Sequence, residues 1–374
     1  SDPGCYYSEI RTPNLDRLAA RGVRFTQFYN GARCSPSRAS LLTGLHPHQT
    51  GIGILTNDDR PRGYPGTLNQ RCVTIAEVLG SAGYRTAMSG KWHLAAQMRE
   101  PNAAWPTRRG FQRFFGTLTG CGSFFQPGTL TRGETNAEDE ARDPDFYYTD
   151  AISDEAVDFV RDCGNTPDTP FFLYVAYTAP HWPLHARDDD LARYRGAFDA
   201  GWDALREARI ARQKAMGLFA AGTRLSARDP TQPAWHDTPD REWQARRMEA
   251  YAAQIDRMDQ GIGRILAALD DTGARNHTLV IFLSDNGACA EAIPLGDLAS
   301  FKERRDILRI RTRDGRDVRI GNEPSIVPGG EDTYASYGRA WANLSNTPFR
   351  YYKRWVHEGG IACPLIVNWP AGAL

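Results

Sequence analysis

The chain has 374 residues, of which 41% are hydrophobic. Lys plus Arg and Asp plus Glu balance at 45 each, and the resulting net charge of +0 does not support a nucleic-acid partner or an anionic membrane surface. No run of about 18 apolar residues is present, so no membrane span is expected. No Ser/Gly-rich or Pro-rich linker divides the sequence, which predicts one large domain over residues 1–374.

Short apolar runs alternate with helical patterns along the chain, which indicates an α/β fold with a mostly buried sheet. Thr12-Pro13 predicts the start of a helix and Gly22 its end, and an alternating strand follows over 23–28. Further on we expect, in chain order, a helix over 74–79, a strand over 84–88, an amphipathic helix over 150–160, a buried strand over 171–177, a long helix over 248–269, and core strands over 278–283 and 364–367.

Two segments lack this alternation of apolar runs and helical patterns, and they are expected to be surface insertions. Residues 187–247 are rich in Ala, Arg and Asp, which predicts a helical and largely exposed segment. Residues 301–346 are polar, with Arg-Asp repeats. Long loops near a sheet edge often shape a substrate pocket, so we expect specificity to reside in these two segments.

Seven cysteines are scattered without a CxxC pair or a zinc-like spacing, so six of them are expected to be buried thiols. Disulfide status stays open, and with it the compartment. No signal peptide is visible at Ser1, and both ends of the chain look cut.

Polar residues cluster directly after three of the expected strands. The turns are Ser89-Gly90-Lys91-Trp92-His93, Thr178-Ala179-Pro180-His181 and Ser284-Asp285-Asn286-Gly287. Ligands in open α/β sheets gather at the carboxyl ends of strands, so the three turns together suggest one shared site. Each turn alone is more often only a turn.

The deciding segment is Cys34-Ser35-Pro36-Ser37-Arg38, followed by Leu42-Thr43-Gly44. Here the sequence resembles the type I sulfatases of the alkaline-phosphatase-like superfamily, in which a maturation enzyme oxidises the motif cysteine to formylglycine. The resemblance extends through 90–93, 179–181, 284–287, and Lys353 before His357-Glu358-Gly359-Gly360, in the family's order. It implies a mostly parallel central sheet flanked by helices.

The chemistry agrees with this resemblance, because a sulfo-thiol offers no easy exit for sulfate. An aldehyde hydrate carries two hydroxyls on one carbon, so that one can attack sulfur and the other can expel sulfate. Pro36 presets a turn, and a helix beginning in the run 37–42 would stabilise an anion at position 34.

The resemblance also implies a role for each matching side chain. Arg38 and His93 support the hydrate made from Cys34. Lys91 and Lys353 hold sulfate oxygens together with His181, which is also expected to protonate the leaving alcohol. Asp285, Asn286 and the residue derived from Cys34 would bind one Ca2+ ion. His357 is expected to orient its loop, and Gly122-Ser123 is a weaker candidate for sulfate contact.

The expected function is therefore hydrolysis of sulfate esters. Expected partners are a sulfated small molecule or glycan and a maturation enzyme, in a periplasmic, secreted or lysosomal-like location. In the family, two further aspartates lie upstream of the segment resembling Ser1-Asp2-Pro3-Gly4, and a smaller C-terminal subdomain follows; both are expected to lie outside this sequence. Two alternatives stay open: a phosphate or phosphonate ester hydrolase of the same superfamily, and a non-catalytic binder of sulfated glycans with unprocessed Cys34.

Overall fold

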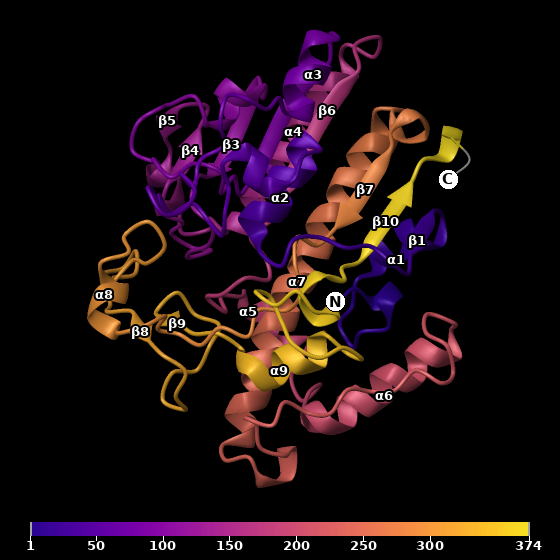
Figure 1. Cartoon of the computed structure of the whole chain (residues 1–374), viewed down its shortest axis with the longest axis vertical. Helices are drawn as coiled ribbons and strands as arrows, with labels where there is room; N and C mark the ends of the chain where they lie inside the picture. Colours follow the sequence, from indigo (N-terminus) through magenta and orange to yellow (C-terminus); the bar gives the residue numbers. More distant parts are fainter. Residues whose placement is uncertain (1, 373–374) are drawn as a thin grey trace.

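The computed structural model describes residues 2–372 and contains two main sheets, the larger of which has helices on both faces (Figure 1). The larger sheet has five strands in the order β5-β4-β3-β2-β6. Their bounds are β2 (Arg85–Gly90), β3 (Arg113–Thr117), β4 (Leu130–Arg132), β5 (Thr135–Asn136) and β6 (Phe171–Ala176). Strand β2 is parallel to both β3 and β6, while β4 is antiparallel to β3 and β5.

The second sheet is antiparallel throughout, with the order β1-β10-β7. Its strands are β1 (Val23–Phe25), β7 (Val280–Leu283) and β10 (Leu365–Asn368), and a small parallel pair joins β8 (Arg319–Ile320) to β9 (Thr333–Tyr334). The α/β class with flanking helices is confirmed. In the larger sheet the longest strands, β3, β2 and β6, are parallel as expected, whereas β4, β5 and the strands of the second sheet pair antiparallel.

Neighbouring residues of β2 face two different helical layers, as the pleat requires. Ala87 packs with Phe159 and Cys163 of α4 (Tyr148–Gly164), whereas Met88 packs with Leu42 of α2 and Ala76 of α3. The helices of the second layer are α2 (Cys34–Thr43) and α3 (Ile75–Ser81). Helix α3 begins as predicted after Thr74, whose hydroxyl accepts a hydrogen bond from the Glu77 N–H at 3.1 Å.

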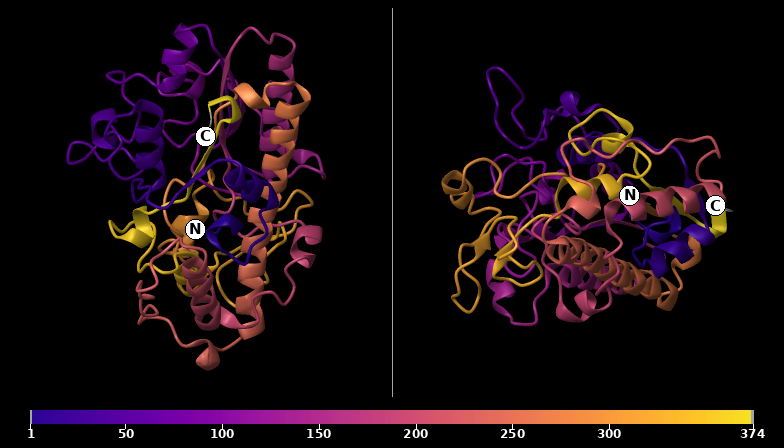
Figure 2. Two further views of the ribbon diagram at one scale, coloured as in Figure 1. Left: turned by 90° about the vertical axis from the view of Figure 1, so that its right-hand side faces the viewer. Right: turned by 90° about the horizontal axis from the view of Figure 1, so that it is seen from below.

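Helices α4 and α7 (Arg241–Asp271) lie side by side under both main sheets (Figure 2, left). Val160 and Leu269 belong to a core cluster that also contacts Leu173 of β6 and Val280 of β7. Within the described chain, β6 and β7 each pair on one side only. Ile281 of β7 is 53% exposed although it lies in an apolar strand. The helix pair, rather than a shared ladder of hydrogen bonds, therefore joins the two sheets.

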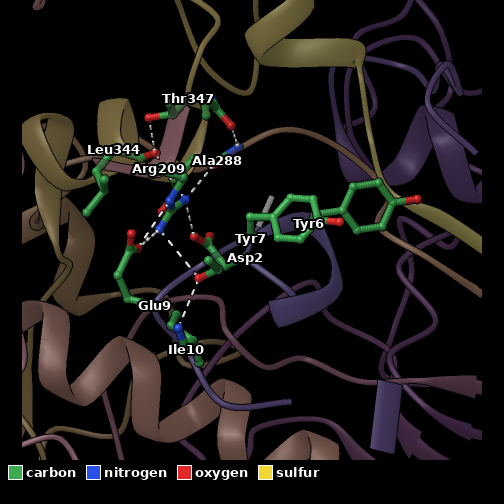
Figure 3. Close-up of polar contacts among 12 residues, drawn as sticks. Asp2, Tyr6, Tyr7, Glu9, Ile10, Arg209, Ala288, Leu344 and Thr347 are labelled. Atoms are coloured by element: carbon green, nitrogen blue, oxygen red, sulfur yellow. Dashed lines mark hydrogen bonds and ion pairs between the residues drawn. The ribbon is translucent and has the colours of Figure 1, made fainter. Parts of the chain in front are cut away.

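Segment 187–247 is less exposed than its composition predicts. It contains α5 (Asp188–Ala192) and α6 (Gly201–Ala215), and its last residues already belong to α7. Arg209 of α6 is fully buried, where it contacts Glu9, donates to Asp2 at 2.9 Å and donates to the Leu344 carbonyl at 3.1 Å (Figure 3). The segment is predicted to be largely exposed, but the buried Arg209 ties α6 to the first described residues of the chain.

Segment 301–346 also buries more than expected. Leu308 and Trp341 are fully buried, the latter in α9 (Gly338–Ser345) against Trp202 of α6, with ring centroids 5.2 Å apart. The remaining helices are α1 (Pro13–Ala20), α8 (Leu298–Lys302) and α10 (Glu358–Ile361). Between residues 2 and 372, no helix combines the length and the apolar character needed to cross a membrane.

Candidate active site

Cys34 lies in the first turn of α2 and is only 3% exposed. The first hydrogen bond of this turn runs from the Ser37 N–H to the Arg33 carbonyl at 3.1 Å. The N–H groups of the first helical residues have no partner within the helix, and they favour negative charge at its N-terminus. Pro36 fits this turn because its missing N–H leaves no helical hydrogen bond unmade. The helix starts three residues earlier than the predicted run 37–42, so that position 34 is part of it.

His93 faces the Cys34 side chain, with its Nδ1 atom 3.3 Å from Sγ. Burial and the charges of Lys91 and Arg38 hold the pKa of His93 well below its ordinary value, so the imidazole is neutral. Gly120 packs directly against the ring, since a Cβ there would lie 2.3 Å from His93 Cε1. A glycine at 120 is therefore required for His93 to occupy this place.

Arg38, one turn further along α2, joins the helix to the ends of two strands. Its Nε donates to Asp285 Oδ2 at 3.0 Å, and one terminal nitrogen donates to the Lys91 carbonyl at 2.7 Å and to the Tyr174 hydroxyl at 3.3 Å. Burial would raise the pKa of Asp285, but the charges of Arg38, Lys91 and Lys353 outweigh it and hold that pKa below its ordinary value. The Asp285 carboxylate is consequently ionised in a cationic surrounding.

His181 follows β6 and lies against Lys353, whose Nζ atom is 3.0 Å from His181 Nε2. The other ring nitrogen, Nδ1, is 3.0 Å from the Trp182 carbonyl, which can only accept a hydrogen bond. This pairing places the ring proton on Nδ1 and leaves Nε2 to accept from the lysine. Burial and the charge of Lys353 hold the pKa of His181 well below its ordinary value, consistent with a neutral ring.

Lys353 is buried in the loop between α9 and α10, and Asn346 fixes that loop. The Asn346 amide donates to the carbonyls of Tyr351 and Gly359 at 2.8 and 2.7 Å, and its Oδ1 accepts from the Ala288 N–H at 3.0 Å. The Lys353 N–H in turn donates to the Ala288 carbonyl at 3.0 Å. The loop is thereby tied to the segment that follows β7.

A family model described as sulfatase matches residues 1–374. The chain belongs to the sulfatase family. An arylsulfatase of Klebsiella aerogenes is 33% identical over 393 residues, which cover 99% of this chain and 78% of the relative. An uncharacterized sulfatase of Schizosaccharomyces pombe is 34% identical over 394 residues, and human arylsulfatase A is 31% identical over 316 residues, covering 49% of its length.

Solved structures agree on the sulfatase fold. Ps i-CgsB, crystallised in complex with k-i-k-neocarrahexaose, superposes with a TM-score of 0.61 at 24% identity over 96% of this chain. This chain spans 61% of the length of that protein. A second neighbour, solved in complex with its substrate D-glucosamine-2-N,6-O-disulfate, gives a TM-score of 0.52 at 20% identity.

Asp285, Asn286 and the residue derived from Cys34 are the predicted ligands of a cation in this sulfatase-family chain. The surroundings of one buried atom, Asn286 Oδ1, test whether these residues suit a metal ion. Asn286 Oδ1 is buried and has no hydrogen-bond partner in the described structure, while its Nδ2 donates to the Gly287 carbonyl at 2.9 Å. A free carbonyl oxygen beside the ionised Asp285 is a donor set that suits a hard cation such as Ca2+. The residues present therefore fit the metal.

Two weaker candidates lie apart from these contacts. His357 packs on Tyr351 with ring centroids 4.6 Å apart, and its role in orienting the loop stays a prediction. Ser123 accepts hydrogen bonds from the N–H groups of Phe125 and Gln126, and its hydroxyl lies 3.4 Å from His185. None of these contacts involves a predicted site residue.

Three residues around the site were missed from the sequence: Gly120, Tyr174 and Glu291. Tyr174 lies within β6, where an apolar run hides the single hydroxyl that reaches Arg38. Gly120 belongs to a Gly-rich stretch after β3 that could have indicated close packing. Glu291 had no signal in the sequence, because Trp182, Lys353 and Arg33, which lie around its carboxylate, come from distant parts of the chain.

Proposed function

We propose that this protein hydrolyses sulfate esters, with formylglycine formed from Cys34. The observation that carries the proposal is the contact of Cys34, at a helix N-terminus, with His93, in a group of buried cations that includes Arg38, Lys91 and Lys353. A sulfate monoester is anionic, and further charge builds on its oxygens during S–O cleavage, so fixed cations stabilise the transition state.

The modified residue, when present, supplies an aldehyde hydrate whose two hydroxyls serve attack on sulfur and release of sulfate. His93, neutral and in contact with position 34, accepts a proton there. Lys91 and Lys353 bind sulfate oxygens, and Arg38 holds the Asp285 carboxylate in place.

Protonation of the leaving alcohol falls to the Lys353–His181 pair. Because His181 Nε2 accepts a hydrogen bond from the ammonium, Nε2 carries no proton of its own; the Lys353 ammonium donates a proton directly to the leaving oxygen and is left as a neutral amine, while His181 holds it in place. Asp285 and Asn286, with position 34, would hold Ca2+, whose charge polarises the sulfate group.

The test is to coexpress the chain with a formylglycine-generating enzyme and to measure the peptide mass across position 34. An aldehyde at 34, with turnover of aryl sulfate in preference to aryl phosphate, is the expected result. A thiol that persists under these conditions would refute the covalent mechanism. Faster turnover of aryl phosphate would instead favour the phosphate-ester alternative.

Cys34→Ser tests whether sulfate release needs the second hydroxyl of the aldehyde hydrate. A serine keeps one hydroxyl but lacks the second, so sulfate release should stall and turnover should cease after at most one cycle. The natural substrate is proposed only as a class, a sulfated sugar or a small aryl sulfate, to be sorted with a panel of both.

A further inference from the structure

Glu291 connects three segments that carry candidate catalytic residues. Its Oε2 accepts hydrogen bonds from Trp182 Nε1 at 3.1 Å and from the Cys289 thiol at 3.2 Å, and it lies 3.7 Å from Lys353 Nζ. Its Oε1 lies 3.8 Å from a terminal nitrogen of Arg33, the residue before Cys34. The side chain is 13% exposed.

The surroundings of Lys353 look like a metal site but hold an ammonium group. His181, Cys289 and Glu291 each offer one ligand atom, all within 4.8 Å of one another. Lys353 Nζ lies 3.0 Å from His181 Nε2 and 3.9 Å from Cys289 Sγ. The three groups thus form a cation site that the chain fills with its own lysine.

Of these three groups, only Glu291 is charged at neutral pH. Burial raises the pKa of the Cys289 thiol to about 11, and His181 is neutral. Burial also opposes ionisation of Glu291, but the charge of Lys353 and the hydrogen bond from Trp182 lower its pKa to about 2. The Glu291 carboxylate is therefore the counter-charge of the buried ammonium.

We propose that Glu291 is a positioning residue that holds the Lys353 ammonium against His181 Nε2 and keeps this pair aligned for proton delivery to the leaving oxygen. Its hydrogen bond to Trp182, the residue next to His181, fixes the imidazole side of the pair, and its ion pair fixes the lysine side. The inference rests on the proposed sulfate-ester hydrolysis and adds a residue to it.

The test compares Glu291→Gln with Glu331→Gln in the processed enzyme. Glutamine keeps an oxygen that can accept from Trp182 but loses the attraction for the ammonium. Glu331 is a matched control, because it is 14% exposed and pairs with Arg313 at 3.1 Å, away from the site residues. Both variants are assayed for kcat and KM on an alkyl sulfate and on nitrophenyl sulfate.

Glu291→Gln should lower kcat for the alkyl sulfate by about tenfold or more, a part of the roughly 10²–10⁴ that general acid catalysis contributes. The kcat for nitrophenyl sulfate, whose leaving group needs little protonation, should change far less, and KM should stay near the wild-type value. Glu331→Gln should match wild type on both substrates. Equal losses on the two substrates, or no loss on either, would overturn the assignment.

A second readout does not depend on turnover. In protein with unprocessed Cys34, the imidazole nitrogen resonances of His181 report the hydrogen bond that Nε2 accepts. Glu291→Gln should shift the Nε2 resonance, whereas Glu331→Gln should leave it in place; an unshifted resonance would overturn the proposal. Should Glu291→Gln fail to fold, Trp182→Phe, which removes one donor to the same carboxylate, takes its place with a shift in the same direction. If wild-type protein hydrolyses no sulfate ester, the proposed function fails, and this measurement still decides the contact.

Discussion

Asn286→Ala should separate the structural from the metal-binding role of this side chain. Among the described residues, Asn286 Oδ1 is buried without a hydrogen-bond partner, while Nδ2 makes one hydrogen bond of 2.9 Å. A buried unpaired polar atom costs about 1–3 kcal/mol and a net hydrogen bond contributes about 0.5–1.5 kcal/mol. Without metal, the variant should therefore be as stable as wild type or more stable, by up to about 2 kcal/mol.

This change in the free energy of unfolding corresponds to a shift of the melting temperature. At about 2.1 cal/mol/K per residue, the 374 residues give an unfolding entropy of about 0.8 kcal/mol/K, so 2 kcal/mol corresponds to about 2–3 °C. Ca2+ at one hundred times its Kd would stabilise the wild type by about 2.7 kcal/mol, or about 3 °C. Asn286→Ala should lose most of this Ca2+-dependent increase in Tm. Without metal, its Tm should equal that of the wild type or lie up to about 2–3 °C above it.

Differential scanning calorimetry in chelator and in Ca2+ measures both effects. Asn343→Ala is the matched control, because Asn343 Oδ1 is likewise buried and without a hydrogen-bond partner but lies within α9 and not in the turn after β7. It should retain the full response to Ca2+. An unchanged Ca2+ response in Asn286→Ala, or a metal-free Tm several degrees below wild type, would refute the reasoning.

Three further outcomes are expected. His181→Ala should slow alkyl sulfates by about 10²–10⁴ but nitrophenyl sulfate far less; equal losses in steady-state assays would remove His181 from proton delivery. Arg209→Met should lower the free energy of unfolding by about 3–5 kcal/mol, because it leaves the Asp2 carboxylate buried without its charge partner; an unchanged urea midpoint would contradict this. The folded-state pKa of Glu291 is about 2, below its ordinary 4.5, so its contribution to stability is complete above that ordinary value and is lost as pH falls toward 2. Glu291→Gln should therefore show a shallower loss of stability over this range in acid titrations followed by circular dichroism, and an identical slope would argue against the ion pair.

Two regularities of the sequence predicted where the candidate site lies: apolar runs mark the strands, and polar residues follow directly after them. Lys91 and His93 after β2, His181 after β6, and Asp285 after β7 each follow a strand whose apolar run is unmistakable. Since strand ends carry ligands in α/β folds, residues far apart in the chain could be assigned to one place. The contacts of Arg38 with both Asp285 and the Lys91 carbonyl agree with that assignment of place, while the chemical roles stay predictions.

What could not be predicted depends on contacts without a local pattern. Arg209 looks like part of a solvated arginine-rich helix, and only the fold brings it to Asp2, 207 positions away. Glu291 lies in an irregular stretch, and its indole partner Trp182 is 109 positions away. The antiparallel direction of β10 could not be predicted either, since the strand has the same apolar character whichever way it runs between β1 and β7.

The division of the strands into two sheets has a mechanical consequence for the site. No ladder of hydrogen bonds crosses from β6 to β7 in the described chain, so the packing of α4 against α7 and the Arg38–Asp285 pair carry the connection. Lys91 follows β2 of the larger sheet and Asp285 follows β7 of the second sheet. A ligand that binds both residues would therefore link the two sheets to each other. Loading the site should then make unfolding more cooperative as well as raise its midpoint, and amides of β6 and β7 should gain protection from hydrogen exchange together.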